Sequence, residues 1–393
     1  MITDSFMFAA TPHIHFGISK RRQLPALIAS FGQRLLLVTG GASFDASLHG
    51  RSLLDSLQNR LEIKRIRVSG EPSPQLVDDA VAAYADWQPD CVVAIGGGST
   101  VDAAKAIAGL LRTGDSVMEY LEGVGRGKTY SGPSTPFIAL PTTAGTGGET
   151  SKNTVLSVIG KDGFKKSFRH DMLVARAIIL DPELTLSCPP DVTAACGMDA
   201  LTQLLESYVS TGAGPVTDAL ALSGLAHVRD ALIPAVEQGD NLSARAGMLY
   251  ASSISGLTLA NAGLGSVHGL ASPLGAFFPI PHGVICGTLL CAAVRQNIEL
   301  LATGKSGHPA LSKYAVAGRL MLDDSALSDD LAREGLLALL DDWTVRLAMP
   351  RLSVYGVTRT DVARIAAHAS GGMHTNPVPL GVWQAEELLI SRL

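Results

Sequence analysis

The sequence predicts an α/β domain with a parallel, doubly wound sheet, followed by an all-helical domain. Three observations support this fold class. The chain has 393 residues, which is longer than one ordinary domain. Short apolar runs alternate with helix-length segments through the first half, whereas strand-like runs are nearly absent after residue 190. We therefore expect an α/β domain over residues 1–186 and a helical domain over residues 187–393.

Five strand-like runs mark the first half of the chain, each rich in aliphatic residues and bounded by glycine, proline or polar residues. They cover residues 34–41, 63–70, 91–99, 136–143 and 176–181. Helical patterns follow three of them, over residues 45–60, 74–87 and 99–112. A continuous apolar run such as Cys91 to Ile95 is what a parallel sheet covered on both faces requires.

Long helical patterns fill the second half, beginning with residues 192–210, 215–236 and 243–262. A small α/β domain packed against a helical domain leaves a cleft between the two. Such clefts commonly bind ligands, so we expect the functional site there.

The composition excludes several classes of protein. Hydrophobic residues make up 47% of the chain and charged residues 17%, which does not suit a disordered or fibrous protein. The net charge is −5 and no basic block occurs, so we expect neither nucleic acid nor an anionic membrane as a partner. The N-terminal residues lack a signal-peptide pattern, and no uninterrupted apolar run reaches 18 residues. Five cysteines without a CxxC pair favour reduced thiols and a cytoplasmic location.

A glycine-rich turn lies directly between a predicted strand and a predicted helix. It consists of Gly96, Gly97, Gly98 and Ser99, and Asp102 and Lys105 follow in the first turns of the helix. Successive glycines let the backbone approach a diphosphate, and the helix N-terminus supplies free N–H groups. The pattern alone is weak, because a plain strand-to-helix turn can have the same sequence. Its place between strand and helix favours phosphate binding.

A second polar, glycine-rich stretch, Pro141 to Ser157, also follows an apolar run. Its hydroxyl groups and backbone amides are suited to lining a nucleotide groove, and a surface loop is the alternative. The candidate cofactor residues in it are Thr142, Thr143, Gly145 and Thr146.

Four motifs together resemble the iron-containing (group III) alcohol dehydrogenase family. They are GGGSTVDAAKAIA, PTTAGTGGETSKNTVLS, DPELTLSCPPDVTAACGMDALTQLLESYVS and VHGLASPLGAFFPIPHG, in the family's order. The resemblance implies a Rossmann-like N-terminal domain and a helical C-terminal domain, the two-domain fold also seen in dehydroquinate synthase-like proteins. It implies a nicotinamide cofactor in the cleft, with Lys165 among the residues that contact it. Hydride would pass between the nicotinamide and an alcohol or aldehyde carbon whose oxygen is held by a divalent metal, Fe or Zn.

The family metal is usually held by one Asp and three His, and this sequence departs from that pattern. The resemblance assigns Asp199, His268 and His282 as ligands, but Gln203 stands where the family has a His, one helical turn after Asp199. An amide oxygen is a harder and weaker donor than imidazole, so we expect Gln203 to weaken the site without abolishing it. A further family histidine near the reacting groups is here Ser272.

The same resemblance gives the catalytic candidates. His268 and His282 act with the metal, and His374, in the segment from Gly371 to Pro377, is a candidate replacement for the imidazole missing at Ser272. A solvent-exposed loop histidine is the alternative for His374.

NADP(H) is favoured over NAD(H) at the adenosine end. Many family members carry Asp at the end of the first strand, where it accepts hydrogen bonds from the ribose and repels a 2′-phosphate. Gly40 stands there in this chain, and Gly41 and Ser43 offer N–H and hydroxyl groups to a phosphate. No Arg or Lys lies in this loop.

The substrate is expected to be a small alcohol or aldehyde, bound near His268, Phe277, Phe278 and His374. The sequence leaves open whether the substrate also carries a polar or acidic group. Two alternatives remain at this stage: an enzyme like glycerol dehydrogenase or dehydroquinate synthase, and a metal-free or degenerate nucleotide-binding member. The apolar composition and the resemblance together favour a homodimer or a larger assembly.

Overall fold

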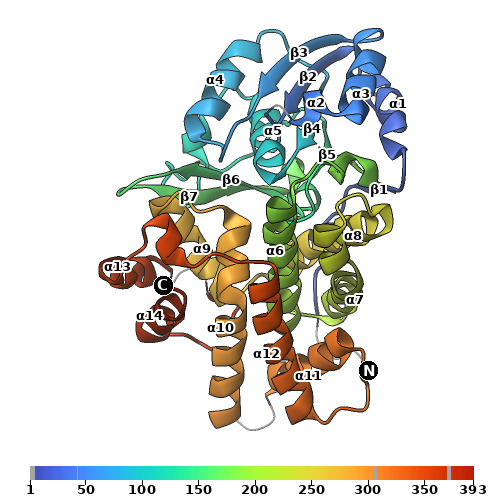
Figure 1. The fold of residues 1–393 in the computed structure, drawn as a ribbon. Helices are drawn as coiled ribbons and strands as arrows, with labels where there is room; N and C mark the ends of the chain where they lie inside the picture. The colour runs from blue at the N-terminus through green and yellow to red at the C-terminus, as the bar shows by residue number, and fades with distance from the viewer. Residues whose placement is uncertain (1–4, 42, 305–307, 370–372) are drawn as a thin grey trace.

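The computed structural model describes residues 5–41, 43–304, 308–369 and 373–393. One end of the molecule is an α/β layer and the other is a bundle of long helices (Figure 1). The main sheet has six strands, and every pair of neighbours is parallel. In spatial order they are β1 (His13–Phe16), β8 (Ala177–Leu180), β5 (Phe137–Pro141), β4 (Cys91–Gly96), β2 (Arg34–Thr39) and β3 (Glu62–Arg67). The predicted fold class is confirmed.

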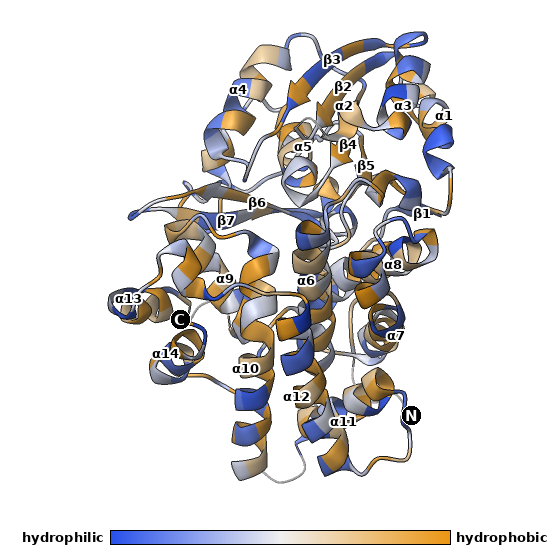
Figure 2. Ribbon diagram, viewed as in Figure 1, coloured by the Kyte–Doolittle hydropathy of each residue, from blue (hydrophilic) through white to orange (hydrophobic). Residues whose placement is uncertain are grey.

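Helices cover both faces of this sheet, as the continuous apolar strands predict. Alternate residues of β4 divide between two cores: Val92 and Ala94 pack with α4 and α5, while Cys91, Val93 and Ile95 pack with α1 and α3. The covering helices are α1 (Leu24–Ala29), α3 (Leu48–Gln58), α4 (Pro74–Tyr84) and α5 (Gly98–Leu110). The hydropathy colouring shows the central strands β2 and β4 as mostly apolar (Figure 2).

Three local expectations need correction. The helix predicted over residues 45–60 is two helices, α2 (Ser43–Ala46) and α3, because the Ser47 side chain caps α3 by accepting a hydrogen bond from the Gly50 N–H. The polar stretch from Pro141 to Ser157 is not loop throughout. It runs into β6 (Asn153–Val158), which pairs antiparallel with β7 (Phe164–Arg169). The short strand β1 is a further element that the sequence analysis missed.

The rest of the chain is helical, and no strand follows Leu180 among the residues that the structure describes. The long helix α6 (Pro190–Val209) packs against α7 (Pro215–Glu237), α8 (Leu242–Ala262) and α10 (His282–Thr303). The remaining helices are α9 (Ser266–Phe277), α11 (Pro309–Leu322), α12 (Asp329–Arg346), α13 (Arg359–Ala369) and α14 (Val382–Ser391).

Two of these helices, α7 and α10, are long and apolar enough to cross a membrane by length and composition alone. Both pack against α6, and two thirds of the α10 window is buried (67%). A core helix of a globular domain passes the same test, so we assign them to the core of the helical part.

Candidate active site

The strand order creates a crevice at the carboxyl ends of β2 and β4. Strands β2 and β4 are neighbours in the sheet. The chain runs from β2 to β3 on one side and from β4 to β5 on the other, so the connections that follow β2 and β4 lead in opposite directions. In open α/β sheets ligands bind at such a switch point. The Gly40 N–H donates to the carbonyl of Ile95 across 3.2 Å, which places Gly40 beside the glycine-rich turn after β4.

The two polar stretches that the sequence analysis assigned to the cofactor lie against each other. Helix α5 begins at Gly98 with Gly97 as its N-cap. A Cβ on Gly97 would lie 3.2 Å from the Thr143 hydroxyl, and a Cβ on Gly98 would lie 2.9 Å from the Thr146 hydroxyl. Glycine is therefore what allows this close approach, and the first N–H groups of α5 lack acceptors within the helix.

The loop after β5 also contacts the helical part, so it joins the cofactor turn to the second half of the site. Gly147 has a φ of +59° and packs on α8, where a Cβ on Gly256 would collide with the Gly147 carbonyl oxygen. A Cβ on Gly145 would lie 2.9 Å from the Cβ of Cys196 on α6. These glycines let the loop lie directly on α6 and α8.

Lys105 holds the far side of this loop from within the core. Its side chain is fully buried, and Nζ donates to the carbonyls of Gly148 at 2.5 Å, Ser151 at 2.8 Å and Asn153 at 2.8 Å. Burial lowers the pKa of Lys105 to about 8, against the attraction of neighbouring carboxylates. Lys105 is therefore a structural residue, not a phosphate ligand.

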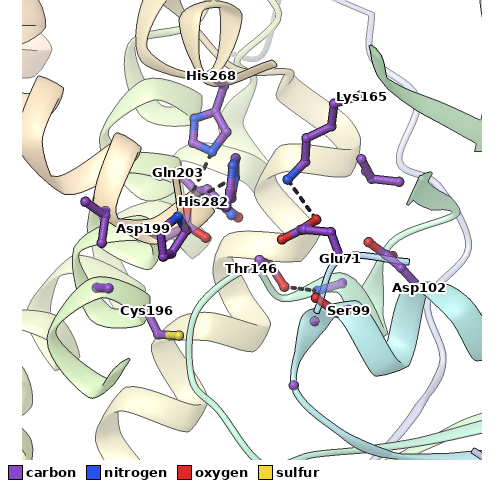
Figure 3. A pocket seen from close by; sticks show the side chains of 18 of the residues that line it. Glu71, Ser99, Asp102, Thr146, Lys165, Cys196, Asp199, Gln203, His268 and His282 are labelled. Carbon is purple, nitrogen blue, oxygen red and sulfur yellow. Dashed lines mark hydrogen bonds and ion pairs between the residues drawn. The ribbon is translucent and has the colours of Figure 1, made fainter. Parts of the chain in front are cut away.

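One cavity of about 1290 Å³ runs between the α/β and helical parts (Figure 3). Most of the predicted site residues line it: Gly97, Gly98, Ser99, Asp102, Thr143, Thr146, Lys165, Asp199, Gln203, His268, His282 and His374. This volume is above the range usual for a single drug-sized ligand, so it has room for a dinucleotide and a small substrate. Among the described residues Gly40, Gly41 and Thr142 do not line the cavity, and Ser43 begins α2.

Two charged side chains face each other across the cofactor half of the cavity. Lys165 on β7 pairs with Glu71, the Nζ and Oε2 atoms lying 3.0 Å apart (Figure 3). Burial raises the pKa of the nearby Asp102 to about 7. The hairpin formed by β6 and β7 is bonded to α9 through Ser272, whose hydroxyl donates to the Lys165 carbonyl at 3.0 Å. The hydroxyl that replaces the family imidazole thus fastens the hairpin.

At the other end of the cavity, side chains from three helices converge. Asp199 comes from α6, His268 from α9 and His282 from the first turn of α10 (Figure 3). The Asp199 Oδ1 atom lies 3.3 Å from Nε2 of His268 and 3.7 Å from Nε2 of His282. Cys286, one turn after His282, places Sγ 3.7 Å from each of these Nε2 atoms. These four donor atoms all lie within 4.8 Å of one another.

Glycines on α10 make this convergence possible. A Cβ on Gly283 would collide with the Ala195 carbonyl oxygen of α6, and a Cβ on Gly287 would lie 2.8 Å from Met198 Cβ. With no side chain at either position, α10 lies directly on α6. His282 and the residue four after it share the helix face turned towards Asp199.

Glu206 orients one of the histidines and is a site residue that the sequence analysis missed. Its Oε2 atom lies 2.7 Å from His268 Nδ1, and its Oε1 accepts from the Val267 N–H at 2.7 Å. With Nδ1 paired to this carboxylate, Nε2 of His268 faces Asp199. Glu206 lies seven residues after Asp199, two turns along the same face of α6, which is the signal that could have found it.

The two imidazoles of the cluster have pKa values shifted in opposite directions. Burial is the largest effect on His268 and opposes its charge, but Cys286, Asp199 and Glu206 together raise its pKa well above the usual value. Burial lowers the pKa of His282 to about 4. Burial alone would raise the pKa of Asp199, but the two imidazoles hold it at about 2.

The residues present fit a divalent cation. Asp199 is 1% exposed, and its Oδ1 faces two imidazole nitrogens, at 3.3 and 3.7 Å, without a well-formed hydrogen bond among the described residues. A carboxylate and two imidazoles are ligands that Fe and Zn share.

The other predicted residues are placed as follows. Gln203 lies beside the cluster, but its Oε1 accepts a hydrogen bond from the Ser255 hydroxyl at 3.1 Å. His374 is exposed and lines the cavity, whereas Gly371 and Gly372 before it lie outside the described residues. Phe277 was expected beside the substrate, but it packs against the His368 ring and Arg364 of α13 and does not line the cavity. Phe278 likewise does not line the cavity.

Comparison with known proteins agrees with the fold. Residues 11–182 match the family described as iron-containing alcohol dehydrogenase, and residues 193–392 match the C-terminal domain of Fe-containing alcohol dehydrogenases. The 1-propanol dehydrogenase PduQ of Salmonella typhimurium is 35% identical over 359 residues, 88% of this chain and 90% of that protein. Long-chain-alcohol dehydrogenase 1 of Geobacillus thermodenitrificans is 42% identical over 220 residues, 56% of this chain and 55% of that protein.

Among solved structures, one described as 1,3-propanediol oxidoreductase superposes with a TM-score of 0.88 at 29% identity, covering 99% of this chain and 100% of that one. The fold and the cavity thus define a two-domain oxidoreductase acting on CH–OH groups. The chain belongs to the iron-containing alcohol dehydrogenase family.

Proposed function

We propose that this protein interconverts a small alcohol and its aldehyde, using NADP(H) in preference to NAD(H) and a divalent ion held by Asp199, His268 and His282. The observation that carries the proposal is the single cavity that joins the glycine-rich turn at α5 to these three side chains. In such a cavity a dinucleotide and a substrate oxygen fit end to end.

The chain binds the dinucleotide through the turn after β4. The N–H groups at the start of α5 would hold the diphosphate, and Thr143 and Thr146 line the same stretch of the cavity. The nicotinamide supplies the hydride or accepts it when bound. Lys165, paired with Glu71, closes the other wall of this half of the cavity.

When bound, the ion supplies Lewis-acid polarisation of the substrate oxygen. Asp199 contributes the negative charge, and Glu206 keeps His268 turned with Nε2 towards the site. A proton must also move between the alcohol and solvent. We assign this step to the imidazole of His374, because it lines the cavity and is exposed, whereas the Ser272 hydroxyl is committed to Lys165.

The preference for NADP(H) rests on the end of β2. Gly40 carries no carboxylate to repel a 2′-phosphate, and an added Cβ would be 3.5 Å from the Thr100 hydroxyl. Two cations lie near this strand end. Arg65 donates to the Thr39 hydroxyl at 2.7 Å. Arg65 and Arg67 both form ion pairs with Asp45, so the three side chains together carry one net positive charge. A cationic fork suits phosphate, so these arginines support the 2′-phosphate.

The deciding experiment measures NADPH and NADH oxidation with a panel of short aldehydes, on protein freed of metal by chelation and then reloaded with zinc or iron. Turnover that depends on the added metal and prefers NADPH supports the proposal. Full activity after exhaustive chelation would refute the role of the ion, and activity with NADH alone would refute the cofactor preference.

We further propose that the protein is a cytoplasmic homodimer. Among the described residues, no strand pairs with the outer edge of β1, and Ile14 and Phe16 on this strand are exposed. Light scattering at micromolar concentration should give twice the chain mass, and a monomer would contradict the assembly.

A further inference from the structure

We propose that Cys286 is the fourth protein ligand of the divalent ion and takes the place of the imidazole that Gln203 replaces. This inference rests on the proposed metal site. The ligand four residues after Asp199 on α6 is lost, and a donor four residues after His282 on α10 is gained. Both spacings put the second side chain one turn along the same helix face.

Four of the six distances between the donor atoms are close to those around a coordinated ion. A tetrahedral ion with bonds of about 2.0–2.1 Å to nitrogen or oxygen and about 2.3 Å to sulfur keeps nitrogen and oxygen ligands about 3.3 Å apart, and nitrogen and sulfur about 3.6 Å apart. The Cys286 sulfur lies 3.7 Å from Nε2 of His268 and 3.7 Å from Nε2 of His282. The Asp199 oxygen lies 3.3 Å and 3.7 Å from the same two atoms.

Both Cys286 and Gln203 are buried, so hydrogen bonding is what separates them. The Cys286 side chain is fully buried, and its sulfur is directed at the two imidazole nitrogens. The Gln203 carbonyl oxygen instead accepts from Ser255, whose hydroxyl also reaches the backbone of its own helix. A buried cysteine that served only as a small apolar residue would not need its sulfur between two ring nitrogens.

A thiolate is a softer donor than the imidazole or amide it stands in for, so this set favours zinc over iron. Four protein ligands still allow catalysis, because zinc expands to five-coordinate when a substrate oxygen joins. Metal binding would also remove the thiol proton, since only the thiolate coordinates.

Cobalt substitution tests the ligand directly, by a signal that does not depend on turnover. Wild-type protein loaded with one Co(II) should show a sulfur-to-cobalt charge-transfer band in the near ultraviolet. Cys286→Ser should lose the band and bind Co(II) and Zn at least tenfold more weakly. The matched control is Cys291→Ser, on the same helix, whose sulfur donates to the Leu337 carbonyl away from the cluster, and it should keep the band.

The outcomes separate this inference from the proposed function. Wild-type protein that binds Co(II) without a sulfur band refutes the Cys286 ligand and leaves the metal site standing. Protein that binds no Co(II) refutes both. Loss of binding in Gln203→Ala together with full affinity in Cys286→Ser would assign the fourth position to Gln203 and overturn the inference. Retention of the band in Gln203→Ala supports it.

Discussion

Glu206 offers the sharpest test of how the fold prepares the metal site. Its carboxylate pairs with Nδ1 of His268 and with the Val267 N–H, both at 2.7 Å, and the residue is 7% exposed. In Glu206→Gln the amide keeps the shape but has one acceptor oxygen, so it can serve only one of these two donors. The NH₂ group then faces the other donor, and the His268 ring loses its orientation.

Loss of such an outer partner typically lowers metal affinity about 10–100-fold, which is about 1.4–2.7 kcal/mol. The lost charge-assisted bond should also lower the free energy of unfolding of the metal-free protein by about 1.5–3 kcal/mol. Chelator competition measures the first quantity and urea unfolding the second. The matched control is Glu334→Gln, at an exposed position on α12, which should change neither. A Glu206→Gln affinity within twofold of wild type would refute the argument.

Three further predictions concern the α/β half. Gly40→Asp should shift preference towards NADH by about 1–3 kcal/mol, measured as the ratio of the NADPH and NADH Kd values; an unchanged ratio would place the 2′-phosphate elsewhere. Lys105→Met removes a buried donor that three carbonyls share, of which that of Gly148 keeps the Ser151 hydroxyl. The change should lower the free energy of unfolding in urea by about 3 kcal/mol, and a loss under about 0.5 kcal/mol would contradict this. Burial raises the pKa of Glu149 to about 7 from its ordinary 4.5, so its contribution is fully present below pH 4.5 and is lost as the pH rises through 7. Between pH 5 and pH 8 wild type should therefore lose about 2–3 kcal/mol more stability than Glu149→Gln, and parallel pH curves would disprove it.

The sheet and its order of elements could be predicted because their signal is local. Continuous apolar strands between helix-length segments require a sheet covered on both faces, and the core residues of β4 alternate between two helix layers as that requires. The elements that were missed have weak local patterns. The strand β1 is four residues long and largely exposed. The strand β6 follows a glycine-rich loop, and the sequence stays polar from the loop into the start of the strand.

The site divides in the same way. From the sequence, the resemblance to the family indicated Asp199, His268 and His282, and the place of the glycine-rich turn between strand and helix indicated the cofactor end. Only the tertiary structure showed that Cys286 and Glu206 join them. Their places depend on how closely α10 and α9 approach α6. Gly283 and Gly287 let α10 lie on α6, and a Cβ on Gly265, just before α9, would lie 2.9 Å from the Glu206 carboxylate. Local spacing puts Glu206 on the helix face of Asp199 and Cys286 on that of His282, but which helices meet on those faces is set by the shapes of the packed surfaces.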